Sequence, residues 1–208
     1  INKKIINIIF CVIKHSMSNL FVLTIVFLMF LFFFLIQLYV IYPIENILFP
    51  SSFIDQASLL YLPHCTRIIM YFILGKIIII PIFLSQCFTF IILNDASIYE
   101  SLILSLISSL SIIFGFELFN FYEKNIYYQI NKIIDWKKIL LIGFFASISN
   151  SFFSTFYFYY TGGIDFNVNL MIRYIIGDTL GLFLGMLVFI FLIKFFGRYL
   201  DNVISKIR

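Results

Sequence analysis

Residues 169–195 read NLMIRYIIGDTLGLFLGMLVFIFLIKF, an apolar run that contains an arginine, Arg173, and an aspartate, Asp178. A helical crossing of a bilayer needs about 20 mostly apolar residues, so this run is long enough to span one. Charged side chains inside a membrane are costly, usually paired and often functional. The stretch therefore predicts a membrane helix that carries part of a polar site.

Three glycines four residues apart, Gly177, Gly181 and Gly185, lie on one face of this predicted helix. Such spacing lets a neighbouring backbone approach closely. We interpret the face first as a packing surface for another segment of the same chain, and second as the seam of a homodimer. Asp178 lies on the flank of this face, so we expect its side chain to point into protein rather than lipid.

The rest of the chain has the composition of a membrane protein. Of its 208 residues, 62% are hydrophobic and 12% are charged, whereas a soluble domain carries about 25% charged residues. The sequence predicts an all-α, polytopic transmembrane bundle with lipid as its main solvent. Six apolar stretches are candidate spans: 19–42, 59–75, 77–94, 101–119, 139–160 and 169–195.

The second candidate span is short and contains Pro63, His64 and Arg67. Gly75 and Lys76 separate it from the third, so these two spans could form a tight helical hairpin.

The basic residues predict the orientation. Loops at about 43–58, 95–100 and 161–168 hold acidic residues and no Lys or Arg, whereas the lysines gather on the other segments. Basic loops stay on the cytoplasmic side, so both termini are predicted to be cytoplasmic. The predicted organisation is an amphipathic interfacial helix over 1–18, a transmembrane domain over 19–195 and a basic cytoplasmic tail over 196–208.

Two charges are predicted to meet inside the bundle. Asp178 lies about 13 Å into its span at 1.5 Å per residue, and Arg67 lies at a similar depth in the second span. We predict an Arg67–Asp178 ion pair with His64 close by, while Arg173 is shallower and reaches toward the outer surface. This group is either a structural polar latch or an outward-facing pocket for an anionic or polar ligand, in which all four residues bind the ligand.

A polar stripe marks the fifth span, where Ser147, Ser151 and Ser154 share one face. Such hydroxyls either join helices or line a cavity. The two histidines and three cysteines form no HExxH or C-x-x-C motif, and phosphate-binding and G-x-S-x-G loops are absent from the sequence. We therefore expect no enzyme, no metal and no cofactor. No basic cluster indicates nucleic-acid binding.

Two stretches together resemble the MASE-type membrane-associated sensor domains of bacteria. One runs from Tyr61-Leu62-Pro63-His64-Cys65-Thr66-Arg67 through Leu74-Gly75-Lys76-Ile77 to Pro81, and the other is Gly177-Asp178-Thr179-Leu180-Gly181 with the apolar run that follows. Cys65 stands where that family would have Gly. The resemblance implies a signal-transduction input module in a bacterial inner membrane. Such modules are usually fused to a kinase or cyclic-dinucleotide output domain, so we expect a stand-alone relative or a truncated chain.

Three functions are compatible with this sequence. The first is a sensory or ligand-binding module with a pocket in the outer half of the bundle, which works with a separate signalling partner or as a homodimer. The second is a small transporter, or the substrate-capture subunit of one, and the third is a structural subunit of a larger complex. A transporter should have a polar lining that reaches both faces. The polar residues cluster in the outer half, which favours the first function.

Overall fold

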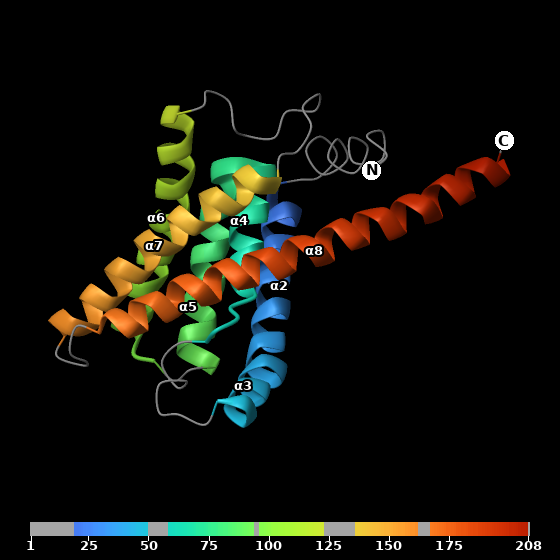
Figure 1. Ribbon diagram of the computed structural model, residues 1–208. Helices are drawn as coiled ribbons and strands as arrows, with labels where there is room; N and C mark the ends of the chain where they lie inside the picture. Colours follow the sequence, from blue (N-terminus) through green and yellow to red (C-terminus); the bar gives the residue numbers. More distant parts are fainter. Residues whose placement is uncertain (1–18, 50–57, 94–95, 123–135, 162–166, 208) are drawn as a thin grey trace.

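The computed structural model describes residues 19–49, 58–93, 96–122, 136–161 and 167–207, and this part of the chain is a bundle of helices (Figure 1). The predicted interfacial helix over 1–18 lies outside the described residues. In chain order the elements are α2 (Asn19–Ile36), the π-helix η1 (Gln37–Ile41), α3 (Tyr42–Leu48), α4 (Pro63–Leu74), the 3₁₀-helix η2 (Gly75–Ile78), α5 (Ile79–Leu93), α6 (Ile98–Tyr122), α7 (Trp136–Tyr160) and α8 (Val168–Ile207).

Within the described residues, five helical stretches are long and apolar enough to cross a membrane, so the chain is a multi-pass membrane protein. They are Leu20–Leu48, Pro63–Ile92, Ile98–Phe121, Trp136–Tyr160 and Val168–Leu192. Four of them correspond to the predicted first, fourth, fifth and sixth spans. The helix that contains the last of these stretches is α8. It remains helical to Ile207, past the boundary predicted at residue 195.

The stretch Pro63–Ile92 is not one straight helix, since the chain reverses at Gly75. Gly75 has φ 73° and ψ −152°, a backbone conformation open to glycine and strained for other residues. Arg67 before the turn and Gln86 after it both donate a hydrogen bond to Ser108 Oγ. In a straight helix these two residues would stand about 28 Å apart.

The prediction of six spans is therefore not supported. α4 has 12 residues, which at 1.5 Å per residue gives a length of about 18 Å. A bilayer core is about 30 Å thick. The helix falls short because residues 58–62, predicted to begin it, precede it as a non-helical segment.

α4 is the central helix of the bundle. Every residue from Pro63 to Phe72 is buried, and the helix packs against α2, α6, α7 and α8. A helix buried on all sides needs apolar residues on all sides, and most of this sequence provides them. Ile68 and Tyr71 join the main hydrophobic cluster with Ile112, Phe116 and Ile142. His64, Thr66 and Arg67 are the polar exceptions.

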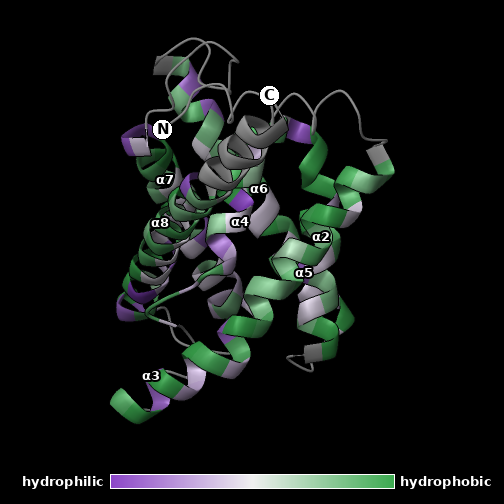
Figure 2. Ribbon diagram, turned by 90° about the vertical axis from the view of Figure 1, so that its right-hand side faces the viewer, coloured by the Kyte–Doolittle hydropathy of each residue, from purple (hydrophilic) through white to green (hydrophobic). Residues whose placement is uncertain are grey.

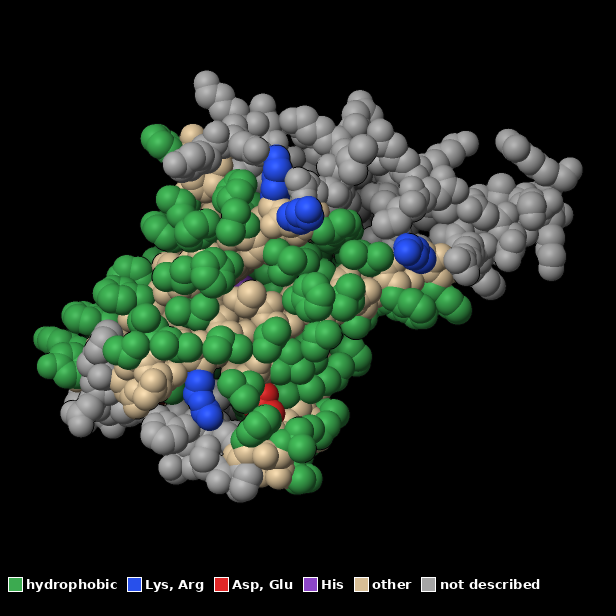
Figure 3. Space-filling view, in the orientation of Figure 1, with side chains coloured by type: hydrophobic (Ala, Val, Ile, Leu, Met, Phe, Trp, Pro, Cys, Tyr) green, Lys and Arg blue, Asp and Glu red, His purple; other side chains and the backbone are tan. Residues whose placement is uncertain are grey.

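The outside of the bundle is apolar, as lipid requires. On α8 the side chains of Leu180, Phe183, Leu184 and Leu187 are all at least 40% exposed, whereas the neighbouring Leu182 is buried. Figure 2 shows hydrophobic residues along most of each helix, and Figure 3 shows a face covered largely by hydrophobic side chains with few charges. This pattern matches a helix bundle whose solvent is hydrocarbon.

The glycine face of α8 holds residues 58–65 of the same chain. A Cβ atom on Gly177 would collide with the Ser58 carbonyl oxygen, and one on Gly181 would collide with the Tyr61 carbonyl oxygen. A Cβ atom on Gly185 would collide with the Cys65 side chain. The intramolecular interpretation of these glycines therefore holds, and the face is covered rather than open to a second copy.

Candidate ligand-binding site

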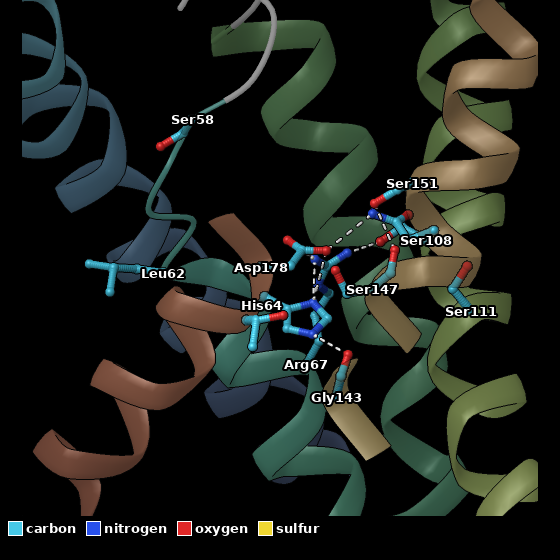
Figure 4. A network of polar contacts seen from close by, with 12 residues as sticks. Ser58, Leu62, His64, Arg67, Ser108, Ser111, Gly143, Ser147, Ser151 and Asp178 are labelled. Carbon is cyan, nitrogen blue, oxygen red and sulfur yellow. Dashed lines mark hydrogen bonds and ion pairs between the residues drawn. The ribbon is translucent and has the colours of Figure 1, made fainter. Parts of the chain in front are cut away.

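An ion pair joins the central helix to α8, which confirms the predicted contact. Arg67 Nη2 lies 3.3 Å from Asp178 Oδ1, and both side chains are at most 3% exposed. His64 Nδ1 lies 2.8 Å from the same Arg67 nitrogen and 3.4 Å from Asp178 Oδ2 (Figure 4). Burying charges is costly unless they are paired and hydrogen-bonded, and this group meets both conditions.

The contact made by the other ring nitrogen of His64 indicates which tautomer gives both nitrogens a hydrogen-bond partner. Nε2 lies 3.3 Å from the carbonyl oxygen of Gly143 on α7. A neutral imidazole with its hydrogen on Nε2 donates to Gly143 and accepts from Arg67 at Nδ1. A Cβ atom on Gly143 would require the tip of the Leu182 side chain to shift and would lie in ordinary van der Waals contact with His64 Nε2 at 3.6 Å.

Further polar side chains complete the group. Arg67 Nη1 donates to Ser108 Oγ on α6, which also accepts from Gln86 Nε2 on α5 at 2.9 Å. Asn150 Nδ2 on α7 donates to Asp178 Oδ2 at 3.4 Å. The guanidinium carbon of Arg67 also lies 5.4 Å from the centre of the Tyr61 ring. Helices α4 to α8 each contribute to one connected polar network.

A cavity of about 350 Å³ opens beside this network. This volume is at the lower end of the range for small-molecule sites. The polar part of its wall comprises Arg67, Gln86, Ser108, Asn150, Ser154 and Asp178, and the aromatic part comprises Phe34, Tyr42, Tyr61, Phe90, Phe158 and Tyr174. Glu100, in the first turn of α6, also lines it and is partly exposed. The cavity lies in the half of the bundle toward α3.

The segment 58–62 forms part of this wall, and its backbone hydrogen-bonds to side chains from η1 and α3. Three successive N–H groups find partners outside the segment: Leu60 donates to Glu45 Oε1 at 3.0 Å, Tyr61 to the Gly177 carbonyl at 2.9 Å, and Leu62 to Gln37 Oε1 at 3.0 Å. Non-helical backbone is tolerated at membrane depth only where protein or a wet cavity surrounds it. Gln37 and Glu45 provide that environment.

The Ser58 hydroxyl links the side chains of Gln37 and Glu45 by hydrogen bonds. Ser58 Oγ accepts from Gln37 Nε2 at 2.9 Å and donates to Glu45 Oε1 at 2.8 Å. Gln37 opens the π-helix η1, a kind of helix distortion that is frequent at functional sites. The sequence interpretation missed both Gln37 and Glu45. The available signal was that Gln37 is the one amide in an otherwise apolar run.

The structure brings together three of the four predicted binding residues. Arg67 and Asp178 line the cavity and His64 contacts both, whereas Arg173 is not among the lining residues. Arg173 stands near the start of α8, five positions before Asp178. That separation, about 140° around the helix, directs the two side chains to different faces. A ligand-binding role for these residues stays a prediction.

Both interpretations of the serine stripe on α7 apply, each at a different position. Ser147 Oγ donates to the Ile175 carbonyl on α8 and so joins two helices, whereas Ser151 Oγ donates to the Ser147 carbonyl within α7 itself. Ser154 lines the cavity instead.

Within the described residues, no group of three or more His, Cys, Asp or Glu side chains could hold a metal ion. Among the residues that the structure describes, Gln86 Oε1 and Arg67 Nε find no hydrogen-bond partner, although both atoms are buried in the cavity wall. Unsatisfied buried polar groups cost free energy and call for an explanation. Comparison with protein-family models, curated proteins and solved structures finds no match for this chain.

Proposed function

We propose that this protein is a membrane sensory module that binds a small ligand in the cavity beside Arg67 and Asp178. The observation that carries the proposal is the unsatisfied Gln86 Oε1 in the wall of a cavity of about 350 Å³. A ligand that donates a hydrogen bond to this oxygen would supply the missing partner. The surrounding polar network orients the wall, and the aromatic side chains provide contact area.

The apolar core supports sensing over transport. On the side of the network toward Gly75, the bundle is filled by Ile68, Tyr71, Ile112, Phe116 and Ile142, each at most 1% exposed. A transport path would need a polar lining through this region. A sensor needs a pocket on one side only.

The form of α8 also supports sensing. This helix carries Asp178 and continues without interruption to Ile207, about 43 Å farther along at 1.5 Å per residue. A rigid helix that begins at the binding site can report a small displacement there at its far end. The proposed partner that reads this displacement is a separate signalling chain or a second copy of this protein.

The proposed topology places the α3 end outside and both termini in the cytoplasm of a bacterial cell. α4 and α5 then act as two short crossings, and residues 58–62 complete the first of them. Lys76 and Glu117 form an exposed ion pair at the opposite end, with Nζ and Oε1 3.1 Å apart. Basic side chains at that end agree with a cytoplasmic location.

Transport remains a second candidate because of the break before α4. Discontinuous helices near the middle of the membrane are typical of transporter binding sites, and residues 58–62 form such a break.

Binding is tested with the full chain in lipid nanodiscs, by measuring the thermal unfolding midpoint against pooled small metabolites. Ser154→Trp fills the cavity, with Ser154→Leu as a milder version, and Phe183→Trp on the lipid-facing side of α8 is the matched control. We expect at least one pool to raise the unfolding midpoint of the wild type and of Phe183→Trp. The same pool should leave the midpoints of Ser154→Trp and Ser154→Leu unchanged. If no pool raises the unfolding midpoint of the wild type and Phe183→Trp above that of the cavity-filling variants, the proposed function is wrong. Uptake of the bound compound into proteoliposomes would favour the transporter.

A further inference from the structure

We infer that the ligand of this cavity is a small organic cation with an N–H donor, a protonated amine. This inference rests on the proposed function and names its ligand class. The sequence-based expectation is an anionic or polar ligand, and the inference keeps only the polar alternative.

The positive charge of Arg67 is already engaged. Its Nη2 atom pairs with Asp178 and contacts His64, its Nη1 atom donates to Ser108, and its guanidinium plane lies against Tyr61. An anion entering the cavity would have to compete with the Asp178 carboxylate for the same nitrogens. The remaining donor, Arg67 Nε, needs only an acceptor oxygen, which an uncharged hydroxyl or ether supplies.

Negative charge is in excess on the cavity wall. Among the described lining residues, Asp178 and Glu100 carry carboxylates and Arg67 alone carries a positive charge. Asp178 is neutralised by Arg67, whereas Glu100 stands toward the opening in the first turn of α6. A partly exposed carboxylate beside a low-dielectric cavity attracts cations to its mouth.

The aromatic side chains that line the cavity also favour a cationic ligand. Tyr61 and Phe90 line it together with Tyr42 and Tyr174. The faces of aromatic rings attract cations, most strongly where water is excluded. Aromatic walls of this kind are the usual way in which proteins bind ammonium groups without a close counter-ion.

A buried acceptor in the cavity wall requires a hydrogen-bond donor on the ligand. Gln86 is 2% exposed, its amide nitrogen is bound to Ser108, and its Oε1 atom has no partner. An ammonium group donates to this oxygen, whereas a carboxylate would place two acceptors against each other. A quaternary ammonium lacks the donor and would leave Gln86 unsatisfied. Primary and secondary amines therefore fit best.

The test uses three probes of similar shape and different charge: 2-phenylethylammonium, 3-phenylpropanamide and 3-phenylpropanoate. Affinities are measured by calorimetry on the full chain in phosphatidylcholine nanodiscs, with empty nanodiscs subtracted to remove partition into lipid. The ammonium should bind about tenfold more tightly than the amide, and the carboxylate should bind most weakly. Glu100→Gln should remove most of the preference for the ammonium, while Glu117→Gln at the other end of the bundle should leave it intact.

Each result decides the inference. A carboxylate that binds more tightly than the ammonium overturns it and leaves the proposed function standing. An ammonium affinity that is equal in wild type, Glu100→Gln and Ser154→Trp also overturns it, since the cation would then bind elsewhere. If none of the three probes binds, the inferred ligand class is wrong. The proposed function is then tested separately by the unfolding midpoints of the wild type and the cavity-filling variants with the metabolite pools.

Discussion

Arg67 and Asp178 form a buried ion pair 3.3 Å long, although 111 residues separate them in the sequence. The pair connects the central helix to α8, and it is enclosed by His64, Ser108 and Asn150. Both charged side chains are at most 3% exposed. The energetic consequences of removing one charge are therefore larger than those of removing both.

The first prediction concerns this pair. Asp178→Asn should destabilise the protein by about 3–5 kcal/mol, because it leaves the Arg67 guanidinium buried without a counter-ion. The double variant with Arg67→Gln should recover part of that loss. The measurement is the free energy of unfolding in detergent for the wild type, both single variants and the double variant. Strict additivity in this cycle would show that the two residues are not coupled.

The second prediction concerns the close approach of the backbone at Gly181. Gly181→Ala should lower the free energy of unfolding by about 1–3 kcal/mol, because the new methyl group meets the Tyr61 carbonyl oxygen. Leu180→Ala, at a lipid-facing position next to it, is the control and should change stability little. Both are measured by thermal unfolding in detergent. Equal midpoints for the two variants would refute the packing of residues 58–62 against α8.

The third prediction separates the acceptor role of Glu45 from its charge. Glu45→Ala removes the oxygen that accepts from Leu60 N and Ser58 Oγ. Leu60 N keeps a second contact with Ser58 Oγ at 3.1 Å, and Ser58 Oγ can still donate to the Leu60 carbonyl at 3.0 Å, so the expected loss is that of a net hydrogen bond, about 0.5–1.5 kcal/mol. Glu45→Gln retains an acceptor oxygen at the same place and should be close to wild type. Hydrogen exchange at the Leu60 amide should accelerate in the alanine variant only. Equal effects of the two substitutions would show that the charge, and not the hydrogen bond, matters.

The fourth prediction concerns topology. Reporter fusions after Lys138 and after Arg208 should report the cytoplasm, and a fusion at Asp165 should report the outer side. The reason is that the loop containing Asp165 has no Lys or Arg, whereas the segment before Lys138 is basic. A cytoplasmic signal from Asp165 would refute the proposed orientation.

The sequence was sufficient for the helices that form long uninterrupted apolar runs. α2, α6, α7 and α8 follow from length and hydrophobicity alone. The ion pair was also predictable, since Arg67 and Asp178 were the deep charges of opposite sign and had matching depth. The turn at Gly75 followed from a glycine and a lysine between two apolar stretches.

The start of α4 could not be predicted because its cause is tertiary. Pro63 marks a helix start, but the hydrogen-bond partners of the non-helical residues before it are Glu45, Gln37 and the Gly177 carbonyl. Leu60 and Leu62 lie 15 and 25 residues from Glu45 and Gln37. Local patterns do not encode such distant partners. The cavity likewise arises from side chains of many helices.

The hydrogen bond from Tyr61 N to the Gly177 carbonyl has a consequence for how the chain enters the membrane during synthesis. The segment before α4 leaves the ribosome long before α8 does. Until α8 is made, the Tyr61 amide lacks its acceptor and Arg67 lacks its counter-ion, so this segment is a poor substrate for stable insertion on its own. The translocation machinery therefore has to shelter it, and its final seating takes place only after the last helix has been synthesised.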